Sequence, residues 1–272
     1  MTTYSASPDL DVTTPASSRV YDVWLGGKDN FAPDRACADS LNAAVPSLPD
    51  AARKNRNFLI RAVQYLVADC GIRQILDIGC GLPAGDNVHE VAQKINPACR
   101  VVYVDNDNVV ASHARALMTN STPEGKAAFI PGDLREPDML LRDDTLRSTL
   151  NLNEPVALLL VGVLPFCDPN TATPAVKTLT TSLPTGSYVA LTHLAEDPLD
   201  APTRELLARV RDQVGLHPFE FGSIAEVDSL LADLIAVEPG LVPASLWQPE
   251  LGPKLDPTGV EEILYAAVAR VP

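Results

Sequence analysis

Two apolar segments, each ending at a turn, constrain the fold of this chain most strongly. Residues 75–81 read Ile-Leu-Asp-Ile-Gly-Cys-Gly, which predicts a buried strand that breaks into a glycine turn. Residues 101–105 read Val-Val-Tyr-Val-Asp, which predicts a second buried strand that ends on a carboxylate. Glycine adopts backbone torsions that a side chain forbids, so Gly79 and Gly81 would let the main chain approach a ligand closely. The combination is typical of the first two strands of a doubly wound α/β fold.

The carboxylate that ends the second strand indicates a cofactor containing adenosine. Asp105 lies 20 residues after Gly85, where a doubly wound fold places the acid that binds ribose hydroxyls. Such a carboxylate accepts two hydrogen bonds from a vicinal diol, and bonds to a charged acceptor are the stronger kind. Asn106 is predicted to contact the same ligand, while Asp107 either joins it or caps the helix that follows.

The glycine turn favours S-adenosylmethionine over a dinucleotide. From Gly79 to Gly85 its order is G-x-G-x-x-x-G, whereas the dinucleotide fingerprint is G-x-G-x-x-G and opens directly into a helix. Asp77 lies two residues before the first glycine, and its carboxylate can hold the cationic amino group of S-adenosylmethionine but would repel a pyrophosphate. Gly79, Gly81 and Leu82 are predicted to contact this cofactor. The alternative is an ordinary strand-to-helix turn that needs glycines for its backbone alone.

Two more loops complete the predicted cofactor pocket. Asp133 follows the third predicted strand, where it could accept a hydrogen bond from the adenine amine, with Leu134 beside it. Its alternative role is to cap the helix that starts near residue 136. Gly162 and Val163 end the fourth predicted strand and are expected to lie beneath the reactive carbon of the cofactor.

No catalytic group is assigned from the sequence, although His193 is a candidate general base. It ends the fifth predicted strand, and a single histidine in that position is more often a structural hydrogen-bonding group. Methyl transfer does not require a strong base, because proximity and orientation supply much of the reduction in the barrier.

Apolar segments alternate with helical segments from residue 74 onward. Strands are predicted over 74–79, 100–105, 127–131, 156–163 and 186–193, with helices between them over 86–95, 108–119, 136–149 and 170–182. This alternation requires a parallel sheet with helices on both faces. The later elements are helices over 201–213 and 223–233 and an antiparallel edge hairpin of strands over 236–243 and 261–270.

The chain divides into three predicted regions. Residues 1–18 are rich in Ser, Thr, Pro and Asp and are expected to be a disordered tail. Residues 19–70 would form an N-terminal helical cover that ends in a long amphipathic helix capped by Asp50, and residues 71–272 a single α/β domain. The basic residues of the long helix are interpreted as a solvated face that offsets nearby acids, with an anion-binding face as the alternative; they are Arg53, Lys54, Arg56 and Arg61.

Composition and charge limit the class of partner. The 272 residues carry a net charge of −14, whose field repels the phosphates of nucleic acids and of anionic membranes. The five cysteines are scattered without a C-x-x-C pair, which favours reduced thiols over disulfides or a metal site. The longest apolar run is too short to span a bilayer, and the N-terminus does not read as a signal peptide. We therefore expect a soluble, cytoplasmic protein that acts on a small molecule; its oligomeric state stays open.

Motifs spread from about Ser18 to Val271 carry a resemblance to a known family. They are Arg19-Val20-Tyr21-Asp22 with Leu25-Gly26-Gly27-Lys28-Asp29-Asn30-Phe31, Asn55-Arg56-Asn57-Phe58-Leu59, Leu76-Asp77-Ile78-Gly79 with Gly81-Leu82-Pro83, Asn87-Val88-His89-Glu90, Val102-Tyr103-Val104-Asp105-Asn106-Asp107, and Val237-Glu238-Pro239-Gly240-Leu241-Val242. In these motifs the chain resembles the actinobacterial S-adenosylmethionine-dependent methyltransferase family first catalogued as a domain of unknown function. The resemblance implies a class I, Rossmann-like core with a doubly wound, seven-stranded, mostly parallel sheet, an N-terminal helical cover and S-adenosylmethionine as cofactor. It implies no particular methyl acceptor.

The glycine loop of the first motif is predicted to form a lid over the cofactor. Gly27 allows close approach of the backbone, and Lys28 and Asn30 could bind the carboxylate at the methionine end. Tyr21 and Trp24 would form an aromatic wall over the sulfonium through cation–π contacts. Closing segments of this kind exclude water from many active sites. The alternative is a surface turn whose aromatic residues pack on the core.

Three functions are compatible with the sequence. The first is methyl transfer from S-adenosylmethionine to an unidentified, small-molecule acceptor. An NADP-linked oxidoreductase would need a basic residue after the second strand, where Asp105 and its neighbours stand, and a Tyr-x-x-x-Lys pair that the chain lacks near the site. The third is a regulator that binds S-adenosylmethionine or S-adenosylhomocysteine without catalysis; measured methyl transfer would separate it from the enzyme.

Overall fold

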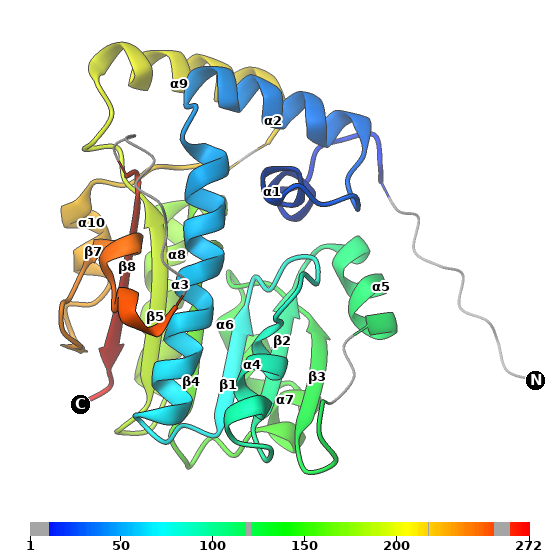
Figure 1. The fold of residues 1–272 in the computed structure, drawn as a ribbon, viewed down its shortest axis with the longest axis vertical. Helices are drawn as coiled ribbons and strands as arrows, with labels where there is room; N and C mark the ends of the chain where they lie inside the picture. Colours follow the sequence, from blue (N-terminus) through cyan, green and yellow to red (C-terminus); the bar gives the residue numbers. More distant parts are fainter. Residues whose placement is uncertain (1–10, 118–120, 217, 253–261) are drawn as a thin grey trace, which may run out of the picture.

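The computed structural model describes residues 11–117, 121–216, 218–252 and 262–272, and its centre is one β-sheet (Figure 1). The strand order is β3-β2-β1-β4-β5-β8-β6, and β7 also pairs with β8. The strands are β1 (Gln74–Ile78), β2 (Arg100–Asp105), β3 (Lys126–Pro131), β4 (Ala157–Leu160), β5 (Tyr188–Leu194), β6 (Ile235–Ala236), β7 (Val242–Pro243) and β8 (Leu264–Arg270). From β3 to β5 the strands are parallel, whereas β8 is antiparallel to β5, β6 and β7.

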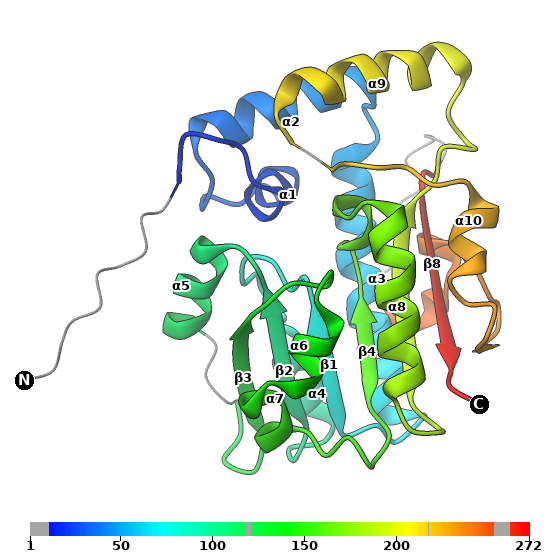
Figure 2. The ribbon, with the colours of Figure 1, turned by 180° about the vertical axis from the view of Figure 1, so that it is seen from behind.

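Helices cover both faces of the sheet (Figures 1 and 2). They are α1 (Ser17–Leu25), α2 (Ala32–Ala44), α3 (Leu48–Ala68), α4 (Val88–Ile95), α5 (Asn108–Leu117), α6 (Pro137–Arg142), α7 (Asp144–Thr149), α8 (Pro169–Ser182), α9 (Ala201–Val214) and α10 (Ile224–Ser229), with the short turns η1 (Leu164–Phe166), η2 (Ala244–Leu246) and η3 (Pro249–Leu251). Buried side chains of α3 and α4 pack on one face, and those of α6, α7, α8 and α10 pack on the other. No helix in the described part of the chain is long and apolar enough to cross a membrane.

The strand order creates a crevice between β1 and β4. The helix after β1, α4, packs on the face that α3 covers, whereas the helix after β4, α8, packs on the opposite face. Where neighbouring parallel strands send their connections to opposite faces, their carboxyl ends leave room for a ligand. The predicted doubly wound, mostly parallel sheet is confirmed, with an edge hairpin in which β6 and β7 both pair with β8.

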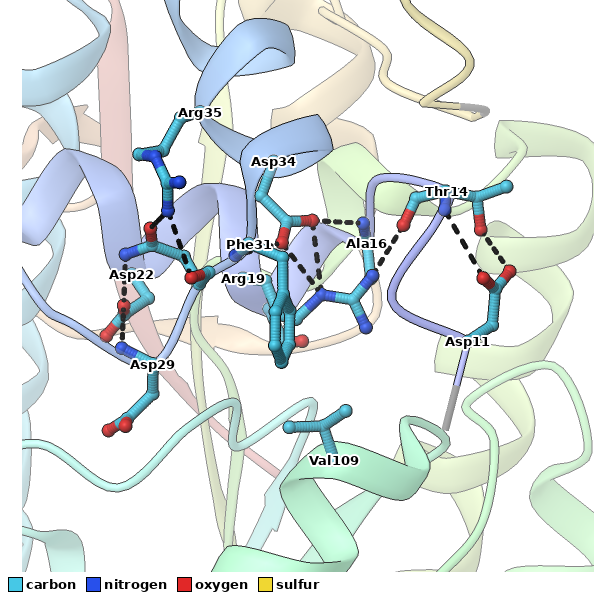
Figure 3. Close-up of polar contacts among 12 residues, drawn as sticks. Asp11, Thr14, Ala16, Arg19, Asp22, Asp29, Phe31, Asp34, Arg35 and Val109 are labelled. Atoms are coloured by element: carbon cyan, nitrogen blue, oxygen red, sulfur yellow. Dashed lines mark hydrogen bonds and ion pairs between the residues drawn. The ribbon is translucent and has the colours of Figure 1, made fainter. Parts of the chain in front are cut away.

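Helices α1 and α2 lie beyond the carboxyl ends of the parallel strands, together with α9, whereas α3 runs along one face of the sheet (Figures 1 and 2). A buried ion pair joins α1 to α2: Arg19 Nε lies 3.1 and 3.0 Å from the two carboxylate oxygens of Asp34 (Figure 3). The same carboxylate accepts the backbone N–H groups of Ala16 at 3.0 Å and Phe31 at 2.8 Å. One buried carboxylate therefore fixes the starts of both helices relative to each other.

The N-terminal boundaries differ from the prediction. The first helix begins at Ser17, so the boundary predicted at residue 18 lies inside a helix; residues 1–10 lie outside the described residues. The long helix α3 begins at Leu48 with Ser47 as its N-cap, three residues earlier than the cap predicted at Asp50, and Pro49 lies in its first turn. A proline is tolerated there because the first N–H groups of a helix have no partner within it.

Some predicted elements are shorter or divided. The helix predicted over 136–149 is interrupted at Asp143, whose carboxylate accepts two backbone N–H groups of α7 and so begins a new helix. The strand predicted over 236–243 is two short strands, β6 and β7. The fourth strand ends at Leu160 because the chain turns at Gly162, whose φ is +79°.

The basic residues of α3 are mostly not the solvated face that the sequence suggested. Arg61 is buried and donates hydrogen bonds to two backbone carbonyls in and after η2, at 2.6 and 3.0 Å. Lys54 is buried and lies 2.9 and 3.1 Å from two carboxylates. Arg56 faces the crevice, and Arg53 alone of the four is exposed. Three of the four cations therefore hold α3 to other parts of the molecule.

Candidate active site

A cavity lies at the carboxyl ends of β1, β2 and β4, beneath α1. Its walls are the glycine turn after β1, the loops after β2, β3 and β4, and one face of α3. It is lined by ten of the residues predicted to bind the cofactor, namely Tyr21, Asp77, Gly79, Gly81, Asp105, Asn106, Asp133, Leu134, Gly162 and Val163. The fold therefore brings most of the predicted site together.

The two glycines of the turn have different roles. Both have a left-handed backbone, with φ of +76° at Gly79 and +65° at Gly81. A Cβ on Gly79 would overlap the side chain of Val163, whereas a Cβ on Gly81 would have open space around it. The N–H groups of Gly79 and Cys80 donate to the carbonyl of Val104 at 2.8 and 3.2 Å. Gly79 therefore lets the loops after β1 and β4 pack together, and Gly81 leaves its side of the turn open.

Asp105 is held at the end of β2 by two backbone donors. The N–H of Gly81 donates to Oδ2 at 2.8 Å, and the N–H of Asp107 donates to Oδ1 at 3.0 Å. Burial raises the pKa of Asp105 to about 6, although these N–H groups favour the ionised form. Asp107 accepts the N–H of Val109 at 2.8 Å at the start of α5, so the capping role that the sequence left open is confirmed. A carboxylate has about four lone-pair positions, so Asp105 keeps acceptor capacity for a ligand.

Asp77 and Arg56 bring opposite charges to another part of the cavity. Burial raises the pKa of Asp77 to about 7, and the nearby Arg56 cation partly offsets that rise. Arg56 Nη2 donates to the backbone carbonyls of Gly85 at 2.9 Å and Asp86 at 2.7 Å. Its Nε is buried and has no hydrogen-bond partner among the described residues. The cavity wall thus carries a buried carboxylate and an unused cationic donor.

Asp133 is engaged by neighbouring side chains. Arg135 donates to it from Nε at 2.8 Å and also from Nη2, and Asn106 Nδ2 donates at 2.8 Å. The hydrogen bond from Arg135 is the main reason that the pKa of Asp133 falls to about 2. The N-cap of α6 is Glu136, so Asp133 does not have the capping role that was its alternative. It is an ionised carboxylate at the edge of the cavity.

A chain of hydrogen bonds fixes Tyr21 between α1, α3 and the sheet. The hydroxyl of Tyr21 donates to the carbonyl of Ala52 at 3.0 Å and accepts from Asn55 Nδ2 at 2.8 Å. Asn55 Oδ1 accepts from the Thr192 hydroxyl at 2.6 Å, which in turn accepts the N–H of Gly162 at 2.8 Å. Burial raises the pKa of Tyr21 to about 12, so the phenol stays protonated.

The loop after α1 does not reach the cavity, contrary to the prediction. The carboxylate of Asp22 accepts the N–H of Asp29 at 3.0 Å (Figure 3) and Asn30 Nδ2 at 2.9 Å. It also lies where a Cβ on Gly27 would stand, and Lys28 is exposed. Gly27, Lys28 and Asn30 therefore do not line the cavity, because Asp22 holds the loop against the end of α1.

Leu82 and His193 also lie outside the cavity. His193 is buried, and its Nδ1 lies 2.8 Å from the carbonyl of Leu194. Burial lowers its pKa. His193 is thus the structural hydrogen-bonding group that the sequence offered as its alternative role, and the other predicted wall residue, Trp24, packs beside the cavity instead of lining it.

Sequence reasoning missed several residues of α1 and α3. Those that line the cavity are Ser17, Ser18, Asn55, Arg56 and Leu59. Asn55 and Leu59 are four residues apart, which places them on one face of a helix, and this spacing was the available signal. The hydroxyl of Ser18 donates to the Asp107 carboxylate and so joins α1 to the start of α5. No periodicity in the sequence indicates that contact.

Comparison with known proteins decides the family. A model of the S-adenosyl methyltransferase family matches residues 3–272. The chain belongs to this family. Two solved structures are similar to it: a DUF574 family protein from Streptomyces avermitilis has a TM-score of 0.88 and 36% sequence identity, covering 96% of this chain and 99% of that chain. A candidate methyltransferase from Thermobifida fusca has a TM-score of 0.86 and 36% identity, covering 97% of each chain.

The methyltransferase shares its fold alone with more distant structures. The plantazolicin methyltransferase BpumL, solved with S-adenosylhomocysteine, has a TM-score of 0.50 and 16% identity, covering 94% of this chain and 95% of that chain. No functionally curated protein matches the chain. The methyltransferase is therefore an S-adenosylmethionine-dependent enzyme by family, as the sequence predicted, and its methyl acceptor is not identified by these comparisons.

Proposed function

We propose that this methyltransferase transfers the methyl group of S-adenosylmethionine to a small molecule, and that the cavity beneath α1 holds the cofactor. The observation that carries the proposal is that one cavity contains Asp77, Arg56 and Asp105. The methionine end of the cofactor bears both a positive and a negative group, and its ribose bears a vicinal diol. The cavity offers an acceptor, a donor and a second acceptor that match these three groups.

The residues present fit the cofactor in charge and in hydrogen-bonding capacity. Asp77 would accept hydrogen bonds from the ammonium group, whose charge favours the ionised carboxylate that burial disfavours. The unpartnered Nε of Arg56 would meet the carboxylate. Asp105, already oriented by two N–H groups, would accept hydrogen bonds from the ribose hydroxyls. Leu134 and Asp133 would border the adenine.

The reaction needs little more from the protein than binding, orientation and exclusion of water. S-adenosylmethionine, when bound, supplies a sulfonium methyl group that an acceptor lone pair can take while the carbon–sulfur electrons stay on sulfur. Tyr21 stays protonated and hydrogen-bonded, so it positions groups and does not remove a proton. Orientation of this kind can lower a barrier by roughly 7–11 kcal/mol. A strong general base is therefore not required.

A small acceptor suits the surroundings of the cavity better than a nucleic acid. The chain has a net charge of −14, and three acidic residues line the cavity: Asp77, Asp105 and Asp133. Phosphates would be repelled by this field. The Ser18–Asp107 contact joins α1, which contributes Ser17, Ser18 and Tyr21 to the cavity wall, to the segment after β2.

Isothermal titration of the full chain with S-adenosylmethionine, S-adenosylhomocysteine and NADP tests the proposal. We expect the first two to bind and Asp105→Asn to weaken them by roughly 10- to 150-fold, because hydrogen bonds to a charged group contribute about 1.5–3 kcal/mol. Asp212→Asn, an exposed change on α9, is the matched control and should leave binding unchanged. Binding of NADP alone, or equal affinities in the two variants, would contradict the assignment.

A further inference from the structure

A second concave site lies at the amino ends of the parallel strands, at the end of the sheet away from α1 and the cofactor cavity (Figures 1 and 2). It is a groove with a volume of about 410 Å³. Its wall is formed by Arg100, at the start of β2, and by residues 147–153, which lead from α7 toward β4. Small-molecule sites in proteins have volumes of about 300–1,000 Å³, so the groove is large enough to hold a ligand.

The groove is built on a row of register partners at the start of three neighbouring strands. Arg100 of β2 pairs with Gln74 of β1 on one side and with Lys126 of β3 on the other. Alternate residues of a strand face the same side of a sheet, so these three side chains project from the face on which α7 packs. The row therefore meets the segment that follows α7.

Contacts with this row hold the segment after α7 in place. Gln74 exchanges two hydrogen bonds with the backbone of Asn151, at 2.6 and 3.1 Å. Lys126 Nζ donates to the carbonyl of Ser148 at 3.1 Å. The groove is thus a built part of the fold, since its far wall is attached to the sheet at both ends.

Three cations at the groove have donors to spare. Each makes one hydrogen bond to a backbone carbonyl among the described residues, at 3.1 Å for Lys126, 2.9 Å for Arg147 and 3.5 Å for Arg100. A guanidinium carries five N–H donors and an ammonium three. All three side chains are exposed, and none forms an ion pair within the part of the chain that the structure describes.

The charge of this groove is opposite to that of the molecule as a whole. Arg100 and Lys126 stand on neighbouring strands about 5 Å apart, where like charges repel. Among the described residues no carboxylate lines the groove, although Glu154 lies beside it and accepts a hydrogen bond from Asn151 at 3.0 Å. The chain has a net charge of −14, so this concentration of cations is local. An anion in the groove would offset the repulsion between them.

We infer that this groove is a second ligand site, separate from the cofactor cavity, which binds a small molecule through a phosphate or pyrophosphate group. The planar fork of an arginine matches the oxygens of a phosphate, and a lysine adds a point charge. Three cations suit a ligand with two or more negative charges better than a single carboxylate. The field of the whole chain repels a long polyanion such as a nucleic acid, so the ligand is small. The inference is independent of the proposed function.

Calorimetry of the full chain with pyrophosphate at constant ionic strength tests the inference. We expect saturable binding of one pyrophosphate per chain, at least tenfold tighter than binding of acetate, and unchanged by saturating S-adenosylhomocysteine. Arg100→Gln and Arg147→Gln should each weaken pyrophosphate binding by about fivefold, the upper value of an exposed ion pair. Arg209→Gln, an exposed arginine of α9, is the matched control and should leave pyrophosphate binding unchanged.

Further measurements keep the test decisive. A cooperative thermal transition shows that each variant is folded, and Lys126→Gln should also weaken binding if either arginine variant does not fold. The absence of saturable pyrophosphate binding, or an equal loss in Arg209→Gln, would overturn the inference. Displacement of pyrophosphate by S-adenosylhomocysteine would also overturn it, because the anion would then occupy the cofactor cavity. Failure of S-adenosylhomocysteine to bind at all would contradict the proposed function alone.

Discussion

Replacing Asp77 with asparagine tests whether this buried carboxyl is protonated in the ligand-free protein. Burial raises the pKa of this carboxyl from 3.8 to about 7 in the folded, ligand-free protein. A group with a raised folded pKa stabilises the fold at low pH, and its contribution is lost as the pH rises through the folded value. The ligand-free wild type should therefore lose stability from this group between about pH 4 and pH 7, whereas asparagine does not titrate.

The size of the effect follows from the width of that window. Each pH unit between the unfolded and folded pKa values changes the free energy of unfolding by about 1.4 kcal/mol. From pH 5.5 to pH 8.5 the wild type crosses about 1.5 units of the window, so Asp77→Asn should gain about 2 kcal/mol relative to the wild type. The asparagine side chain adds its own cost to the free energy of unfolding, but this cost is independent of pH and cancels in the comparison.

Urea denaturation at several pH values across this range measures the difference directly. Asp212→Asn, on the exposed side of α9, controls for the loss of one negative charge and should show no such slope. Addition of S-adenosylmethionine should stabilise the wild type and not the Asp77→Asn variant, because a ligand stabilises only the protein that binds it. A stability difference that stays constant from pH 5.5 to 8.5 would refute the buried, protonated state of Asp77.

Three further predictions follow from the contacts described above. Arg19→Ala leaves the buried Asp34 carboxylate without its cation, and urea denaturation should show a loss of about 3–5 kcal/mol; a loss below 1 kcal/mol would contradict the role given to the pair. Affinity for S-adenosylmethionine should fall as the pH drops from 8 to 5.5, since Asp77 and Asp105 take up protons near pH 7 and 6; calorimetry would show a flat profile if neither carboxylate binds the cofactor. Gly79→Ala places a Cβ against the loop after β4 and strains a φ of +76°, so thermal unfolding should occur at a lower temperature.

The sheet and the part of the site built on it could be predicted because strand and ligand signals are local. The buried segments, the glycine turn and Asp105 lie within one stretch of sequence, and the alternation of strands and helices fixes which strand ends meet. The glycine turn and Asp77 also indicated S-adenosylmethionine, and the family resemblance implies the same cofactor. Nothing in these steps required knowledge of long-range side-chain contacts.

The N-terminal cover could not be predicted in the same way because its contacts are long-range. The Gly-Gly-Lys-Asp-Asn segment has the composition of a ligand-binding loop. Its position is set by Asp22 of the preceding helix, whose carboxylate accepts hydrogen bonds from the loop. Arg61 looks like a surface residue by type, yet its partners are carbonyls 183 and 186 residues away. Asn55 was not predicted to line the site, because only the packing of α3 decides which face of the helix meets the cavity.

The end of β2 connects three separate parts of the molecule through consecutive side chains. Asp105 receives the glycine turn, Asn106 donates to Asp133 in the loop after β3, and Asp107 receives the Ser18 hydroxyl of the first helix. Each contact depends on the direction in which its side chain leaves the backbone. An insertion or deletion of one residue in this segment would turn the three side chains away from their partners at once. The number of residues in the segment is therefore constrained more strictly than the type of each residue.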